Sequence, residues 1–203
     1  VEYLKSLNAL SNRFVLAHSL HLNDDELHII ADSGAATVHN PASNMKLASG
    51  MRFRFDTMRS MGIPIGIGTD GCSSSNNLDM FIAMRLAALL GKAWQSSPTA
   101  TKAGDIYQAA TADGYRILGL NGGKITEGAL ADIVLLKANH PTMVPCHSLV
   151  SNLVYAADGS LVDTTIVDGK VLVRHGKAEG ADEVLSEAAK RAYTLIEKYG
   201  IKC

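Results

Sequence analysis

The chain has 203 residues and carries 19 Lys and Arg against 20 Asp and Glu, which gives a formal net charge of −1. Apolar residues make up 47% of it, the composition of a globular protein that buries a core rather than of a disordered chain. The balanced charge gives no electrostatic footprint for nucleic acid or an anionic membrane, and no apolar run approaches the ~18 residues of a membrane span.

Three short apolar runs in the first half of the chain have the length and composition of buried strands. Each run is followed at once, or after one residue, by an ionisable side chain. The runs and these side chains are residues 14–17 with His18, residues 35–38 with His39, and residues 63–68 with Asp70.

Helical patterns separate the three strand candidates. The predicted helices cover residues 24–33, 52–61 and 103–118, with a further long helix after Asp70. Asn23 is the expected cap of the first helix and Gly34 its expected end. The apolar face of the long helix is predicted to consist of Leu78, Phe81, Ile82, Leu86, Leu89 and Leu90. Strands that alternate with helices predict an α/β fold with a parallel sheet.

The character of the sequence changes near residue 121. Beyond it, residues 131–136 and 164–173 have the composition of strands, and Asp168-Gly169 within the second run is a hairpin signal. Residues 181–199 form the last helix candidate. The predicted units are therefore an α/β unit over residues 1–120, a β-rich segment over residues 121–180, and a C-terminal helix over residues 181–203.

His18, His39 and Asp70 are the candidate chemical groups. The carboxyl ends of parallel strands lie on one face of the sheet, so these side chains are expected around one pocket. Carboxylate oxygen and imidazole nitrogen are ligands for zinc or iron, and they also form acid–base pairs. Each residue alone has an ordinary alternative, Asp70 in a turn and either histidine as a core side chain. The repetition at three strand ends favours the functional interpretation.

Two polar segments follow these strand ends. Residues 39–50 form a long predicted loop that is either a binding loop or a plain connector. Residues 72–77 offer hydroxyls and amides, and Asn76 or Asn77 is the expected cap of the long helix. Cys72 has no activating partner in the sequence, and the serines lie outside any Gly-x-Ser-x-Gly elbow, so neither nucleophile is predicted. No glycine-rich phosphate loop is present, so a nucleotide cofactor is not indicated.

The cysteines indicate the compartment. Cys72, Cys146 and Cys203 are far apart and form no Cys-x-x-Cys pair. This spacing argues against a disulfide framework and against a cysteine zinc site. Together with the absence of a secretory leader, it predicts a cytoplasmic location.

Four blocks of the sequence together resemble the amidohydrolase superfamily, and within it the 5-methylthioadenosine/S-adenosylhomocysteine deaminase group. The blocks are "LAHSLHLNDDEL" (16–27), "VHNPASNMKLASG" (38–50), "GIGTDGCSSSNNLDMFIAMRLAALL" (66–90) and "GKITEGALADIVLL" (123–136). The resemblance covers nearly the whole chain in order and spacing. It implies the C-terminal strands and helices of a TIM-type (β/α)8 barrel, which the chain leaves at the fourth block to enter a small β-sandwich.

The resemblance implies a role for each matching residue. Asp70 matches the aspartate of the eighth barrel strand, a metal ligand that also carries the proton of the attacking water. His18 matches the histidine of the sixth strand, which hydrogen-bonds the nucleophile or the developing tetrahedral centre. The implied substrate-binding residues are His39, Asn40, Ser43, Asn44 and Ser74. Ser75 stands where the group usually has Asn, which affects the details of that loop.

The resemblance also implies a cofactor, partners and an activity. One divalent metal is expected, zinc with iron as the alternative, and most of its ligands are expected outside this segment. The family's His-x-His pair, fifth-strand histidine and nearby glutamate have no match in the chain, so the N-terminal half of the same protein is an expected partner. The implied activity is metal-dependent hydrolytic deamination of an adenosine thioether such as methylthioadenosine or S-adenosylhomocysteine. The alternatives are hydrolysis of guanine or a chlorotriazine by the same fold, and a non-catalytic half-barrel. The expected substrate is a small molecule, and no nucleic-acid or membrane partner is expected. A homo-oligomer is left open.

Overall fold

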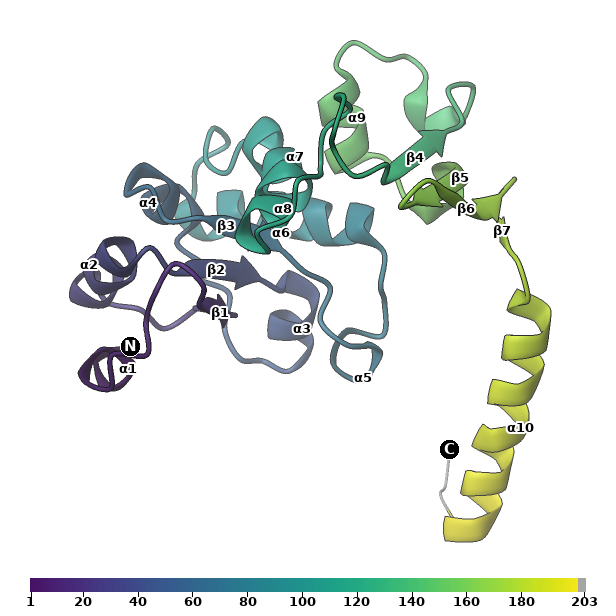
Figure 1. Cartoon of the computed structure of the whole chain (residues 1–203), viewed down its shortest axis with the longest axis horizontal. Coiled ribbons are helices and arrows are strands. Elements are labelled where there is room, and N and C mark those ends of the chain that lie inside the picture. The colour runs from purple at the N-terminus through teal and green to yellow at the C-terminus, as the bar shows by residue number, and fades with distance from the viewer. Residues whose placement is uncertain (201–203) are drawn as a thin grey trace.

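A three-stranded parallel sheet forms the centre of the first half of the chain. The computed structural model describes residues 1–200, and Figure 1 shows this sheet with the helices around it. The strands follow the order β1 (Val15–Ala17), β2 (Ala36–His39) and β3 (Ile65–Ile67). Val15 pairs with Ala36, and Thr37 with Ile65. The three strand predictions and the parallel α/β arrangement are confirmed.

Helices connect and cover these strands. They are α1 (Glu2–Ser6), α2 (Asp24–Ser33), α3 (Pro41–Lys46), α4 (Phe55–Ser60), α5 (Cys72–Ser75), α6 (Met80–Gln95), α7 (Ala103–Ala110) and α8 (Ala112–Ile117). α2 begins at its predicted cap, because Asn23 Oδ1 accepts the Glu26 backbone N–H at 2.8 Å and the Glu26 carboxylate accepts the Asn23 N–H at 3.0 Å. Gly34 ends the helix in the left-handed conformation at φ 71°.

The main core lies between the parallel sheet and its helices. Leu27 of α2, Met58 of α4 and Ile106 of α7 are fully buried there, together with Phe53 in the segment before α4. Burying a side chain of this size contributes roughly 1.5–3 kcal/mol. This packing fixes the strand ends from which the candidate site residues project.

The second half of the chain holds an antiparallel sheet in the order β4–β5–β6–β7. Its elements are β4 (Ile133–Leu136), η1 (Pro141–Met143), α9 (Leu149–Tyr155), η2 (Gly159–Leu161), β5 (Val162–Val167), β6 (Lys170–Arg174) and β7 (Lys177–Ala178). Asp168-Gly169 turns between β5 and β6 with both residues at positive φ, as the hairpin signal predicts. Among residues 1–200 this sheet forms a single layer, so the predicted β-sandwich is not confirmed.

The helix α9 joins the two halves. It packs against α6 and α7, and its Val154 belongs to the main core with no exposed surface. Two hydrogen bonds support the contact: Arg85 Nη2 donates to the Ala157 carbonyl, and the Gly159 N–H donates to Asp79 Oδ2, both at 2.6 Å. The β-rich segment therefore shares part of its core with the α/β unit.

The last helix, α10 (Ala181–Tyr199), stands apart from both sheets in Figure 1. None of its residues is buried, and Val184, Leu185, Tyr193 and Leu195 are all exposed. The helix itself agrees with the prediction. Within the described residues 1–200, no helix is both long enough and apolar enough to cross a membrane.

The structure corrects the predicted loop over residues 39–50 and the predicted helix over residues 103–118. The first contains the six-residue helix α3, in which Pro41 occupies the first turn, where its fixed φ and missing N–H suit a helix start. The second is two helices, because Thr111 lies at φ −126°, ψ −98°. The Thr111 hydroxyl donates to the Tyr107 carbonyl at 2.7 Å, a local bond that competes with the helical ladder.

The structure also corrects the start and the buried face of the long helix. Asp79, rather than Asn76 or Asn77, is its cap, and Asp79 Oδ1 accepts the Phe81 N–H at 2.8 Å. Leu78 therefore precedes the helix and is exposed, while Leu89 is 49% exposed. The buried face consists of the residues Ala83, Met84, Ala87, Ala88 and Gly91. Small side chains at this face let α6 approach its neighbours closely. Of the predicted face, Phe81 packs partly buried against the core, whereas Leu78 and Leu89 do not.

Candidate active site

The structure brings His18 and Asp70 together at the carboxyl ends of β1 and β3. His18 Nε2 lies 4.0 Å from Asp70 Oδ2, and the two side chains are 44% and 32% exposed. Both residues have positive φ, 68° and 60°, which is uncommon for residues other than glycine. Strained backbone that the surrounding structure maintains is typical of functional sites, at a cost on the order of 1–3 kcal/mol per residue.

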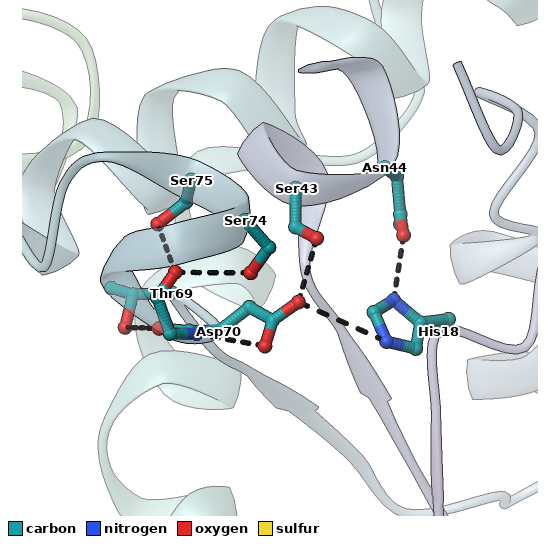
Figure 2. Close-up of polar contacts among 8 residues, drawn as sticks. His18, Ser43, Asn44, Thr69, Asp70, Ser74 and Ser75 are labelled. Carbon is teal, nitrogen blue, oxygen red and sulfur yellow. Dashed lines mark hydrogen bonds and ion pairs between the residues drawn. The ribbon is translucent and has the colours of Figure 1, made fainter. Parts of the chain in front are cut away.

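The short helix α3 connects the two side chains (Figure 2). The Ser43 hydroxyl donates to Asp70 Oδ2 at 2.6 Å, and Asn44 Oδ1 accepts from His18 Nδ1 at 2.7 Å. Ser43 and Asn44 are both 1% exposed, so this part of the site is built from buried groups. Pro41 starts α3 one intervening residue after β2, which places these side chains between the ends of the two flanking strands.

Asp70 is held as a charged carboxylate. The Ser43 hydroxyl is the main cause of a pKa below the ordinary value, followed by the Gly71 backbone N–H. The Gly71 N–H donates to Oδ1 at 2.7 Å. A carboxylate with a lowered pKa stays ionised at neutral pH, and an ionised carboxylate is the form that binds a cation.

His39 and Asn40 end the central strand and lie inside the protein. His39 is 3% exposed and stacks on Phe53, with 4.3 Å between the ring centroids and 13° between the ring planes. Burial, with a smaller effect of nearby His18, lowers its pKa to about 3. Asn40 lies against Gly68, where any Cβ would collide with Asn40 Oδ1. The structure gives both residues packing positions, and their substrate contact stays a prediction.

The serines after Asp70 form the short helix α5. The hydroxyls of Ser74 and Ser75 both donate to the Gly71 carbonyl, at 3.0 and 3.2 Å (Figure 2). Cys72 is exposed. Ser74 belongs to α5, which begins two residues after Asp70, and its substrate contact stays a prediction.

Lys46 is a site residue that the sequence interpretation missed. Its Nζ donates to the Ser73 carbonyl at 3.3 Å and to Asn76 Oδ1, so it ties α3 to α5. A lysine in the last turn of a helix is a recognisable C-terminal signal. Because the sequence predicts a loop over residues 39–50, this signal does not identify Lys46 there. His21 and His28 are exposed and bond to the backbone carbonyls of Ser49 and Asp24.

The side chains of Asp70 and His18 are suited to form part of a metal site. Asp70 provides ionised carboxylate oxygen and His18 provides imidazole nitrogen, and both are ordinary zinc ligands. Over residues 1–200, no group of three or more His, Cys, Asp or Glu side chains could hold a metal ion. The described part of the chain therefore offers Asp70 as one ligand, with His18 beside it, and not a complete site.

Comparison with known proteins defines the class. The model of the amidohydrolase family matches residues 1–172, and the chain belongs to this family.

Among the curated relatives, the chain is 44% identical over 197 residues to the 5-methylthioadenosine/S-adenosylhomocysteine deaminase 1 of Archaeoglobus fulgidus, which covers 94% of this chain and 47% of the relative. It is 40% identical over 198 residues to the 5'-deoxyadenosine deaminase of Methanospirillum hungatei, with 98% and 44% covered. The chain thus spans about half the length of the curated relatives that it matches.

Solved structures of hydrolases also align with nearly the whole of this chain. An adenosine deaminase from Xanthomonas campestris with bound zinc aligns at a TM-score of 0.90 with 33% identity, over 97% of this chain and 45% of that one. A zinc complex of atrazine chlorohydrolase from Arthrobacter aurescens aligns at 0.81 with 26% identity, over 94% and 43%. The fold of this chain is therefore that of a segment shared by zinc-bound hydrolases.

Proposed function

We propose that the chain forms the part of a metal-dependent deaminase that carries Asp70 and His18, and that the enzyme removes the amino group of an adenosine-type substrate. The observation that carries this proposal is the Asp70 carboxylate, held ionised by Ser43 and Gly71 with His18 Nε2 at 4.0 Å. The remaining metal ligands would come from the rest of a (β/α)8 barrel. We call the assembled protein the complete enzyme.

In this proposal Asp70 would hold a divalent metal, zinc or iron, together with those remaining ligands. Such a metal supplies a water that is activated near neutral pH. Asp70 accepts a proton as the water oxygen bonds to C6 of the purine, and the carboxyl group returns this proton to the departing amino group. The bond between C6 and the amino nitrogen breaks, which releases ammonia and leaves a 6-oxopurine. His18 faces the same space through Nε2, which would accept a hydrogen bond from the attacking water.

The relatives favour an adenosine-type substrate over another ring. The relatives that are 40–44% identical are named as methylthioadenosine/S-adenosylhomocysteine or 5'-deoxyadenosine deaminases, whereas the triazine hydrolases align at 25–27% identity. Hydrolysis of another ring, guanine or a chlorotriazine, is the second candidate, and the fold shared with the triazine hydrolases supports the chlorotriazine. In both cases the substrate is a small molecule that Ser74, His39 and Asn40 would help to enclose.

The architecture of the complete enzyme is part of the proposal. The parallel sheet would supply the last three strands of the barrel, and the antiparallel sheet would be one layer of a small sandwich. Exposed apolar side chains on that sheet, including Val134, Leu135, Val171 and Leu172, support a second layer over it. The division at residues 120 and 180, the cytoplasmic location and a homo-oligomer stay predictions.

A substrate panel tests this function. Ammonia release is measured with the complete enzyme on methylthioadenosine, S-adenosylhomocysteine, 5'-deoxyadenosine and guanine, and chloride release is measured on a chlorotriazine. The Asp70→Asn variant is the matched control. We expect ammonia from at least one adenosine derivative and none from the variant. Turnover of guanine or the triazine alone would transfer the proposal to the second candidate, and no turnover on any compound would favour the non-catalytic half-barrel.

A further inference from the structure

Two adjacent side chains of α3 reach both reacting groups. Ser43 Oγ lies 2.6 Å from Asp70 Oδ2, and Asn44 Oδ1 lies 2.7 Å from His18 Nδ1 (Figure 2). His18 and Asp70 belong to the ends of the outer strands β1 and β3, and α3 follows the middle strand β2. One turn of α3 therefore contacts both His18 and Asp70, which lie at the ends of two different strands.

We propose that Ser43 and Asn44 are positioning residues that fix the orientation of the Asp70 carboxylate and of the His18 ring. This inference rests on the proposed deaminase function and goes further, because it assigns to α3 the task of aligning the proton carrier with the histidine.

The bonds to Asp70 hold its carboxylate plane. Ser43 binds Oδ2 and the Gly71 N–H binds Oδ1 at 2.7 Å, so each oxygen has one fixed donor. An ionised carboxylate has about four lone-pair sites, so these two bonds leave roughly one site on each oxygen for a cation and for a proton. Rotation of the carboxylate would break both bonds at once, which makes the observed orientation the stable one.

The bond to His18 selects which ring nitrogen faces the reaction. Asn44 Oδ1 accepts from Nδ1, so the proton of the neutral ring is on Nδ1 and the lone pair of Nε2 points toward Asp70 and the substrate space. Asn44 is 1% exposed, and its Nδ2 has no hydrogen-bond partner among residues 1–200. Burial of the unpaired NH2 group of Asn44 costs free energy. The hydrogen bond between Asn44 Oδ1 and His18 helps to offset this cost.

The burial of Ser43 and Asn44 distinguishes a positioning role from direct contact with the substrate. Ser43 and Asn44 expose almost no surface, and their oxygen atoms are already bonded to Asp70 and His18. A substrate would meet Asp70 and His18 themselves, which are 32% and 44% exposed. Loss of a positioning bond should therefore reduce turnover without weakening substrate binding.

The test compares Asn44→Leu with Asn44→Asp in the complete enzyme. Leu has a similar size but no acceptor, whereas Asp keeps an oxygen that can accept from Nδ1. Supporting partners of metal-site residues typically contribute about 10–100-fold in activity, so we expect kcat to fall by about that factor in Asn44→Leu, with KM within about threefold and unchanged metal content. Asn44→Asp should restore most of kcat. Met45→Leu, on the same helix and 39% exposed, is the control and should behave as the wild type.

Nitrogen NMR measures the tautomer of the His18 ring, which should not change if Asn44 has only a structural role. With 15N-labelled histidine, above the pH at which free imidazole is protonated, His18 should show one tautomer with its proton on Nδ1. Asn44→Leu should show a mixture that includes the Nε2–H form, and His18→Gln identifies the signals. Ser43→Ala should lower kcat by about tenfold and leave this tautomer unchanged.

The outcomes separate this inference from the proposed function. A wild-type enzyme without any deaminase activity would overturn the function, while the tautomer of His18 would still test Asn44. Wild-type kcat in Asn44→Leu, failure of Asn44→Asp to recover activity, or a raised KM with unchanged kcat would overturn the positioning role. An unchanged tautomer in Asn44→Leu would overturn it as well.

Discussion

Replacing His39 by Phe should change how the stability of the protein depends on pH. The His39 ring is 3% exposed, stacks on Phe53 and has an Nδ1 atom without a hydrogen-bond partner among residues 1–200. A phenyl ring keeps the stacked shape and needs no hydrogen bond, so the free energy of unfolding at pH 7 should stay within about 1.5 kcal/mol of the wild type. The difference between the two proteins should appear in acid.

The sign follows from the lowered pKa. In the unfolded chain the His39 pKa is the ordinary 6.5, whereas burial lowers it to about 3 in the folded protein. Below pH 6.5 the unfolded state therefore binds a proton that the folded state refuses, and stability falls as the pH falls. Each pH unit corresponds to about 1.4 kcal/mol, so this group should cost the wild type about 2 kcal/mol at pH 5 and about 3 kcal/mol at pH 4.

Urea denaturation at pH 7, 6, 5 and 4 measures this effect. The free energy of His39→Phe minus that of the wild type should rise steadily from pH 6.5 downward, while other titrating groups cancel in the difference. His28→Gln, which removes an exposed histidine of α2, is the control and should show no such trend. A difference for His39→Phe that stays constant between pH 7 and pH 4 would show that burial does not keep this ring neutral.

Three further changes have defined outcomes. Asp70→Asn in the complete enzyme should abolish ammonia release and reduce the metal content, because it removes a charged ligand and the proton carrier; full activity would contradict the assignment. His18→Ala should lower kcat far more than metal content, measured by elemental analysis, and normal turnover would show that His18 is structural. Gly91→Ala should lower the free energy of unfolding in urea by about 1–2 kcal/mol, since the new Cβ would meet Thr101 Cβ at 2.7 Å; an unchanged or higher value would show that α6 can shift.

The strand ends could be predicted from the sequence because short apolar runs and their ionisable endings are local features. His18 and Asp70 follow β1 and β3 as expected, and the parallel order places them together. The hairpin at Asp168-Gly169 was also predictable, since its geometry depends on two residues. Each of these predictions depends on a few neighbouring residues.

The errors arose where packing decides the structure. Pro41 and the polar residues after it are turn formers, so the sequence predicts a loop. The same residues form the helix α3 because Ser43 and Asn44 bond to distant strand ends. The predicted apolar face of α6 includes Leu89, yet Leu89 is exposed and Ala87 is buried, because the smaller residue fits the closer contact. The contacts that decided both cases join residues far apart in the sequence.

The positioning bonds could not be predicted from the sequence. Ser43 and Asn44 were expected to contact substrate by resemblance, and only the folded structure shows that their oxygen atoms bond to Asp70 and His18. A hydrogen bond between residues 26 or 27 positions apart depends on the register of three strands, and no local pattern encodes that register.

The most direct test of the account is ammonia release from methylthioadenosine by the complete enzyme before and after its metal is removed. The enzyme is stripped with a chelator, elemental analysis confirms the loss of about one metal ion per chain, and zinc is then added back. Activity should disappear with the metal and return with zinc in the wild type, and it should not return in Asp70→Asn. Undiminished activity in protein shown to be free of metal would contradict it.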